Sequence, residues 1–234
     1  MTSSAAQDAF SIIEGLDQAL DQKNIRIVDL TWKVYPGKEE RTMEAHHVTF
    51  PFTEKLMGEF TMNTHVSTHV ESMVHMGLQA GGPDAASIPL ETLVGSAVYL
   101  EIHNLKAGQM ITVDDLPKEP EIRPGDIVIV GTDCHHKERP TFLPEVAQYL
   151  VDKGAKVVGL DRWLVVDTPA KTHKPGEIYC HDILLNKDNF VPIIEEFDHL
   201  DQLKHKRFFF MGVPIRVDGL DSAPIRAIAF EPAD

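Results

Sequence analysis

The sequence predicts an α/β protein folded as a single domain that spans residues 1–234. The main observation is the order of three segments. A β-branched run at 126–130 precedes a helical periodicity at 143–153, in which Pro144 suits the first turn, and a second short apolar run follows at 156–160. This strand, helix, strand order is typical of a parallel crossover unit. No repeat, low-complexity stretch or long linker divides the chain, so we expect one core.

The first element expected along the chain is an amphipathic helix at residues 4–22. The apolar side chains of its pattern are Phe10, Ile13, Leu16 and Leu20, close to the spacing of one helical face. Because this helix precedes the first strand signal, residues 1–24 could form a helical arm that packs on a partner subunit. A helix that covers its own domain is an equal alternative.

Short apolar runs between turn residues predict the strands. Residues 25–30 form such a run before a Pro-Gly turn, and residues 95–102 have the β-branched character of an interior strand. The tail contains three further runs, at 208–211, 213–217 and 225–230, separated by Pro and Gly. We expect each of the three to be a strand.

The composition excludes several classes of partner and site. The net charge of −14 disfavours nucleic acid and anionic membrane surfaces. No segment reaches the roughly 18 apolar residues of a membrane span, and the first residues lack the pattern of a signal peptide. Two cysteines, Cys134 and Cys180, do not make a disulfide framework. We therefore expect a cytoplasmic protein that acts on a small molecule.

Histidine is the unusual residue, since three of the twelve lie between His65 and His75. The odd positions of this segment are His, Ser, His, Glu, Met and His, whereas the even positions are mostly β-branched. An extended backbone puts the imidazoles and the carboxylate on one face, and a helix does not. Residues four apart in a straight strand are separated by about 13 Å, whereas ligands converge to about 2 Å from a metal. We therefore expect a bend near Ser67-Thr68 or after Glu71.

Bent in this way, the segment offers imidazole nitrogens and a carboxylate oxygen to a divalent cation. This ligand set is common in catalytic zinc sites, and it suits zinc, manganese or iron better than calcium. The alternative is a polar strand face that is merely solvated. Three histidines with an interleaved glutamate, opposite an apolar face, favour the metal site.

The segment from His65 to His75 resembles the motif H-x-G-T-H-x-D-x-P-x-H of the cyclase-like metal hydrolases, the family of bacterial kynurenine formamidase and isatin hydrolase. Other segments are similar to further motifs of that family, in order, over roughly residues 25–230. They are residues 29–31, 123–128, 159–161, 181–185, 194–200 and 222–227. The resemblance implies a swivelling β/β/α fold with a mixed sheet, and a homodimer or homotetramer.

The resemblance also implies a set of metal ligands for Zn²⁺ or Mn²⁺. They are His65, His69 and Glu71, with His181 and Glu195 completing a two-metal site. His75 takes the place of the family's catalytic histidine, a general acid/base. Three residues depart from the motif, because Ser67, Glu71 and Met73 stand where the family has Gly, Asp and Pro. Glutamate adds a methylene, so it can ligate only if the backbone lies about one bond length further back.

These observations predict a metal-dependent amidohydrolase in which metal-activated water cleaves a C–N bond of a small amide, formamide or cyclic amide. The alternatives are a metal-dependent cyclase or dehydratase, a lactone hydrolase, and a protein that binds metal or ligand without turnover. The aromatic candidates for a substrate pocket are Trp32, Phe60 and Trp163, with Phe50 and Phe52. Plain core is their alternative role. The run Cys134-His135-His136 is a second place to look for metal, although a polar loop explains it better.

Overall fold

The computed structural model describes residues 4–21, 23–52, 54–77, 81–167 and 174–233. Eight strands form its main sheet, in the order β1-β12-β11-β5-β7-β9-β10-β4. Because β12 also pairs with β4, seven of these strands close into a barrel-like ring. The eighth strand, β1, pairs with residues 228–232 of β12, further along β12 than the residues that pair with β4. The bounds are β1 Ile25–Asp29, β4 His69–Glu71, β5 Val94–Ile102, β7 Ile127–Thr132, β9 Val157–Asp161, β10 Ile193–Phe197, β11 Arg207–Pro214 and β12 Ser222–Pro232.

The centre of the sheet is parallel and its margins are antiparallel. Strands β5, β7, β9 and β10 run parallel to their neighbours in this group, whereas β11, β12, β1 and β4 pair antiparallel. Helix α2, Pro144–Asp152, joins β7 to β9 and has Pro144 in its first turn. The predicted crossover unit is therefore confirmed, and so is the mixed sheet.

The parallel strands are buried on both faces, as crossover helices require. Alternate residues of β7 enter two separate apolar clusters. Val130 packs in the cluster that contains Leu150 of α2, and Ile129 packs in the cluster that contains Phe197 of β10. This double burial explains why the strand has a continuous β-branched run in the sequence.

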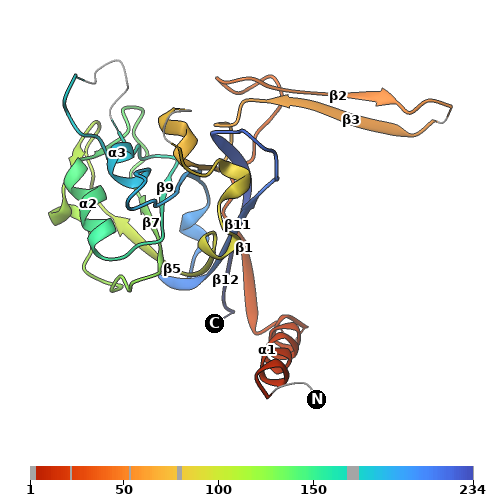
Figure 1. Ribbon diagram of the computed structural model, residues 1–234, viewed down its shortest axis with the longest axis horizontal. Helices are drawn as coiled ribbons and strands as arrows, with labels where there is room; N and C mark the ends of the chain where they lie inside the picture. The colour runs from red at the N-terminus through yellow and green to blue at the C-terminus, as the bar shows by residue number, and fades with distance from the viewer. Residues whose placement is uncertain (1–3, 22, 53, 78–80, 168–173, 234) are drawn as a thin grey trace.

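Two elements lie apart from the main sheet (Figure 1). Helix α1, Ser4–Asp21, lies beyond the start of β1, which confirms the predicted helix. Leu16 is half-exposed, and the side chains of Phe10 and Ile13 lie outside what the structure describes. Strands β2, Met43–Thr49, and β3, Leu56–Met62, pair with each other as a long hairpin that projects from the body.

The tail differs from its prediction in one respect. The sequence pattern predicts separate strands at 208–211 and 213–217, but β11 runs without a break to Pro214, and residues 215–217 lie outside it. Gly212 does not end the strand. A Cβ at this position would collide with the Phe210 ring, so the glycine makes room inside the strand for a core side chain. The third run, at 225–230, lies within β12 as expected.

The remaining short elements are α3, Cys180–Leu184, and the parallel pair β6, Met110–Ile111, and β8, Thr141–Phe142. Among the described helices, none is both long and apolar enough to cross a membrane.

Candidate metal centre

The histidine segment bends at both places expected from its spacing. His65 lies in a turn, and Ser67 has a φ of 70°, the left-handed conformation that favours the glycine of the family motif. The chain is extended over β4, His69–Glu71, and through Ser72, and then enters a short 3₁₀ helix, Met73–Met76. The two bends fold the segment around a small volume instead of letting it run straight.

Three donor atoms of this segment converge on one point. The Nδ1 atom of His65 lies 3.1 Å from Nε2 of His69 and 3.0 Å from Oε1 of Glu71, and the last two atoms are 3.6 Å apart. Ligand atoms at 2.0–2.1 Å around a tetrahedral zinc ion are separated by about 3.3 Å. The spacing and the nitrogen and oxygen donors therefore fit a divalent transition metal.

The two distant ligands reach the same place. Strand β10 pairs with β4 so that Glu195 lies opposite His69, and Oε2 of Glu195 is 3.7 Å from His69 Nε2. Helix α3 brings Nε2 of His181 to 3.0 Å from Oε2 of Glu71. Glu71 therefore faces His65 and His69 with one oxygen and His181 with the other. All five ligands implied by the family resemblance lie together.

The imidazoles of the candidate ligands His69 and His181 are also held from behind by an oxygen atom. Nδ1 of His69 donates to the carbonyl oxygen of Ser67 at 2.9 Å, and Nδ1 of His181 contacts Oδ2 of Asp167 at 2.7 Å. Such outer contacts set which nitrogen faces a metal. For both histidines this nitrogen is Nε2.

Sequence reasoning missed two carboxylates, Asp167 and Asp221. Oδ2 of Asp221 contacts Nε2 of His65 at 2.8 Å and Nδ1 of His75 at 3.0 Å. Asp221 directly precedes the segment 222–227 that resembles a family motif, and this position was the only available signal. Nothing in the sequence near Asp167 indicated its role.

The charges of the centre perturb its pKa values in a consistent direction. Burial alone would lower the pKa of His181, but its contacts with Asp167 and Glu71 outweigh burial and raise the pKa to about 10. Burial would raise the pKa of Glu71, yet its contacts with His181, His65 and His69 hold that pKa well below its usual range. Burial and the nearby charge of Glu71 raise the pKa of Glu195.

His75 is the most accessible of the four imidazoles, with 31% of its side chain exposed, whereas His69 is fully buried. Its Nε2 lies 3.9 Å from Oε1 of Glu71, and its ring centroid is 4.8 Å from that of His65. His75 therefore borders the donor set on the side that is open to solvent.

The three aromatic candidates fall into two places. Trp32 and Trp163 flank the guanidinium group of Arg162, which lies 4.1 Å and 5.3 Å from their ring centroids. The backbone N–H of Trp32 donates to Oγ1 of Thr68, so this group adjoins the histidine segment. Phe60 is instead 63% exposed on the projecting hairpin, and Phe50 and Phe52 are also exposed, near the tip of the hairpin. Within one chain, Phe60 does not close a pocket.

The second cluster considered from the sequence is divided among separate partners. Cys134 Sγ contacts Asp133, His135 stacks on Trp163, and His136 Nε2 donates to the carbonyl oxygen of Leu105. Among the described residues, the groups of side chains that could hold a metal ion all contain His65 or Glu71, and none contains a residue of 134–136. The polar loop that the sequence also allowed is thus the better description of residues 134–136.

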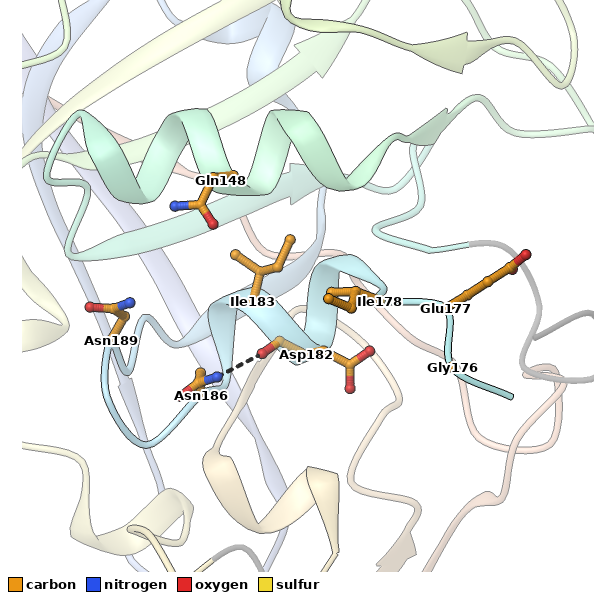
Figure 2. Close-up of a pocket in the computed structure, with 8 residues that line it drawn as sticks. All are labelled: Gln148, Gly176, Glu177, Ile178, Asp182, Ile183, Asn186 and Asn189. Atoms are coloured by element: carbon orange, nitrogen blue, oxygen red, sulfur yellow. Dashed lines mark hydrogen bonds between the residues drawn. The ribbon is translucent and has the colours of Figure 1, made fainter. Parts of the chain in front are cut away.

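A groove lies between α2 and α3, with a volume of about 540 Å³ (Figure 2). Its lining includes Gln148, Asp182, Asn186 and Asn189, and none of the candidate metal ligands. This groove is separate from the centre.

The fold and the donor set together define a protein built around a candidate divalent-metal centre. The family described as Putative cyclase matches residues 28–167, more than half of the chain. The chain belongs to this family.

The chain shares less than 30% of its residues with each of three relatives. The chain is 28% identical to the kynurenine formamidase of Erythrobacter litoralis over 207 residues, which cover 86% of this chain and 89% of that protein. A solved structure described as a potential metal-dependent hydrolase with cyclase activity is 28% identical, with a TM-score of 0.68, and the match covers 89% of this chain and all of that one. Isatin hydrolase A from Ralstonia solanacearum is 20% identical, with a TM-score of 0.72 over 94% of this chain and 97% of its own. These likenesses confirm the fold class.

Proposed function

We propose that this protein is a metal-dependent amidohydrolase that cleaves a C–N bond in a small amide, formamide or cyclic amide. The observation that carries the proposal is the convergence of His65, His69 and Glu71 within 3.0–3.6 Å, with the partly exposed imidazole of His75 beside them. The names of its relatives, kynurenine formamidase and isatin hydrolase, support an amide substrate. The proposed class of substrate therefore rests on this donor set and on the family.

The centre would hold Zn²⁺ or Mn²⁺ through His65, His69 and Glu71, with His181 and Glu195 available for a second ion. When bound, such a cation acidifies water and polarises a carbonyl group. His75 takes a proton from the attacking water and returns it to the leaving nitrogen, so that a C–O bond forms as the C–N bond breaks. The side chain of His75 suits this role because it is accessible and close to Glu71.

The test is a comparison of wild type with His75→Ala after removal of metal and reconstitution with Zn²⁺ or Mn²⁺. We expect turnover of an N-formyl aromatic amine or an isatin-like lactam in the wild type. The variant should bind metal within about threefold of wild type and lose roughly 10²–10⁴-fold in kcat, the usual contribution of a general acid/base. Loss of metal in the variant would make His75 a ligand instead. No turnover of any of these substrates by the reconstituted wild type would refute the amidohydrolase.

A cyclase or dehydratase reaction is the second candidate. The description of the family as Putative cyclase favours it, as does the similarity to the potential hydrolase with cyclase activity, at a TM-score of 0.68. Lactones and 2-hydroxy acids belong in the same substrate screen. Turnover of these compounds without amide hydrolysis would favour the second candidate, and zinc binding without any turnover would favour a binding protein.

We also propose that the protein works as a homodimer or homotetramer. Two apolar features of the chain are uncovered and support an assembly. Ile27 and Phe209 are exposed on the outer face of the sheet, on either side of Phe230, and the hairpin carries exposed Leu56 and Phe60. A two-stranded ribbon is at best marginally stable alone in water, and most assemblies of identical chains are symmetric, so that each copy can cover exposed apolar side chains of another. Light scattering at several concentrations tests this, and a monomer throughout would refute it.

A further inference from the structure

Asp221 occupies an unusual position, because a single oxygen of its side chain contacts two histidines of the centre. Oδ2 lies 2.8 Å from Nε2 of His65 and 3.0 Å from Nδ1 of His75. The other oxygen, Oδ1, accepts a hydrogen bond from Oγ1 of Thr64 at 3.2 Å. The carboxylate is thus fixed at both ends, and it lies behind the imidazoles as seen from Glu71.

The backbone of Asp221 is fixed as well. Its carbonyl oxygen accepts hydrogen bonds from both the N–H and the hydroxyl group of Ser72, at 2.9 Å and 2.7 Å. Ser72 directly follows Glu71, and Ser222 pairs with Glu71 where β12 meets β4. The closure of the barrel therefore sets where the carboxylate of Asp221 lies relative to the donor atoms.

The consequence is a choice of nitrogen atom in each ring. A neutral imidazole has one N–H donor and one lone-pair nitrogen, and a partner on one side decides which is which. If each ring directs its N–H group at Asp221, the other nitrogen of the ring carries the lone pair. His65 then presents the lone pair of Nδ1 to His69 and Glu71. His75 presents the lone pair of Nε2 toward Glu71. His69 and His181 present Nε2, so the nitrogen that His65 uses differs from theirs.

We propose that Asp221 is a positioning residue that selects the nitrogen which His65 presents to the metal and His75 presents to the substrate. The part that concerns His75 rests on the proposed function. Asp221 ties the ligand and the proton carrier to one oxygen atom, so that neither ring can turn or change tautomer independently of the other. Its loss should weaken metal binding through His65 and turnover through His75.

The experiment compares Asp221→Ala and Asp221→Asn with wild type, and uses Asp218→Asn as a matched control. Asp218 lies in the same loop and is exposed, so its variant makes the same change in charge away from the centre. Zinc affinity is measured by competition with a chelator, and the imidazole tautomers are measured by ¹⁵N NMR of histidine-labelled, zinc-loaded protein. Where wild type turns over an N-formyl aromatic amide, kcat and KM are measured too.

We expect Asp221→Ala to lose about 10- to 100-fold in zinc affinity, the usual effect of removing a partner of a ligand histidine. The ¹⁵N signals of His65 and His75 should show a mixture of tautomers, and kcat should fall more than KM rises. Asp221→Asn keeps one acceptor oxygen and should lie between alanine and wild type, and Asp218→Asn should match wild type.

Two results would overturn the proposal. Unchanged tautomers in Asp221→Ala, with zinc affinity within twofold of wild type, would show that other contacts position the rings. Loss of zinc in both variants, well beyond 100-fold, would show that Asp221 is itself a ligand. If wild type binds zinc but hydrolyses no amide, the proposed function fails, and the affinity and tautomer measurements still decide the role of Asp221.

Discussion

Glu71 joins the two halves of the centre because its carboxylate oxygens reach in different directions. Oε1 lies 3.0 Å from Nδ1 of His65, and Oε2 lies 3.0 Å from Nε2 of His181. The variant Glu71→Asp removes one methylene and draws the carboxylate back by about 1.5 Å, the length of one C–C bond. The backbone cannot follow easily, because β4 is paired on one edge with β10 and on the other with β12.

The distances give the size of the effect. We take Oε1 of Glu71 to lie about 3.0 Å from a unit positive charge, the distance that separates it from Nδ1 of His65. At an effective dielectric constant of about 20, lengthening this distance to about 4.5 Å weakens the attraction by about 1.8 kcal/mol, or roughly 20-fold in a binding constant. The attraction between the carboxylate and a divalent cation weakens by more than this, because the attraction is proportional to the charge of the cation. We therefore expect Glu71→Asp to bind Zn²⁺ at least about 20-fold more weakly than wild type, although aspartate is the residue of the family motif at this position.

Competition with a chromophoric chelator measures this affinity directly. Glu59→Asp is the matched control, because it makes the same change on the exposed hairpin and should leave zinc binding unchanged. Zinc binding by Glu71→Asp as tight as that of wild type, or tighter, would refute the reasoning. It would mean that the backbone of β4 approaches the metal as closely as an aspartate requires.

Three further predictions concern stability. Ser67→Gly should be more stable to unfolding by denaturant than Ser67→Ala by about 1 kcal/mol, since both lose the hydroxyl contact with Trp32 but only glycine relieves the left-handed backbone; equal stabilities would contradict this. Burial alone would raise the pKa of Asp126, but its contacts with Arg207, Ser96 and the backbone of Arg123 together outweigh burial and lower that pKa. The contribution of Asp126 to stability is therefore present above about pH 4 and is lost as the pH falls through the lowered pKa. Asp126→Asn should cost about 2–3 kcal/mol at pH 7 and flatten the acid limb of a plot of unfolding free energy against pH, and an unchanged limb would refute it. Stripping metal with a chelator should lower the melting temperature, because zinc at 1,000 times its Kd stabilises the fold by about 4.1 kcal/mol, and an unchanged melting curve would argue against a metal bound in the native state.

The sequence pattern was sufficient to predict those helices and strands whose burial requires a simple arrangement of apolar residues. The crossover from β7 through α2 to β9 was predictable because parallel strands buried on both faces have apolar runs in the sequence, and a helix with Pro144 in its first turn separates them. The hairpin of β2 and β3 was not. Both of its faces are exposed, so the run from Met43 to Thr49 has no apolar alternation by which a strand could be detected.

The same distinction applies to the site. His65, His69 and Glu71 lie close in sequence, and their period-2 spacing with the need to converge on one ion predicted a bend, either near residues 67–68 or after Glu71. The structure bends at both places. Asp221 lies 156 positions from His65 and reaches it only because β12 closes the barrel against β4. No local pattern encodes that closure. The placement of Asp167 behind His181 likewise depends on how the segment after β9 packs against the start of α3.

The three departures from the family motif each have a compensating partner nearby. Ser67 adopts the left-handed conformation of the motif glycine, and its hydroxyl group donates to the carbonyl oxygen of Trp32 at 2.6 Å. Met73 replaces a proline and is buried against Gly82, where any Cβ would collide with the Met73 thioether. Glu71 uses its extra methylene to span the distance between two sets of histidines. Each change is therefore accommodated beside the candidate centre, and none of the three removes a donor atom from it.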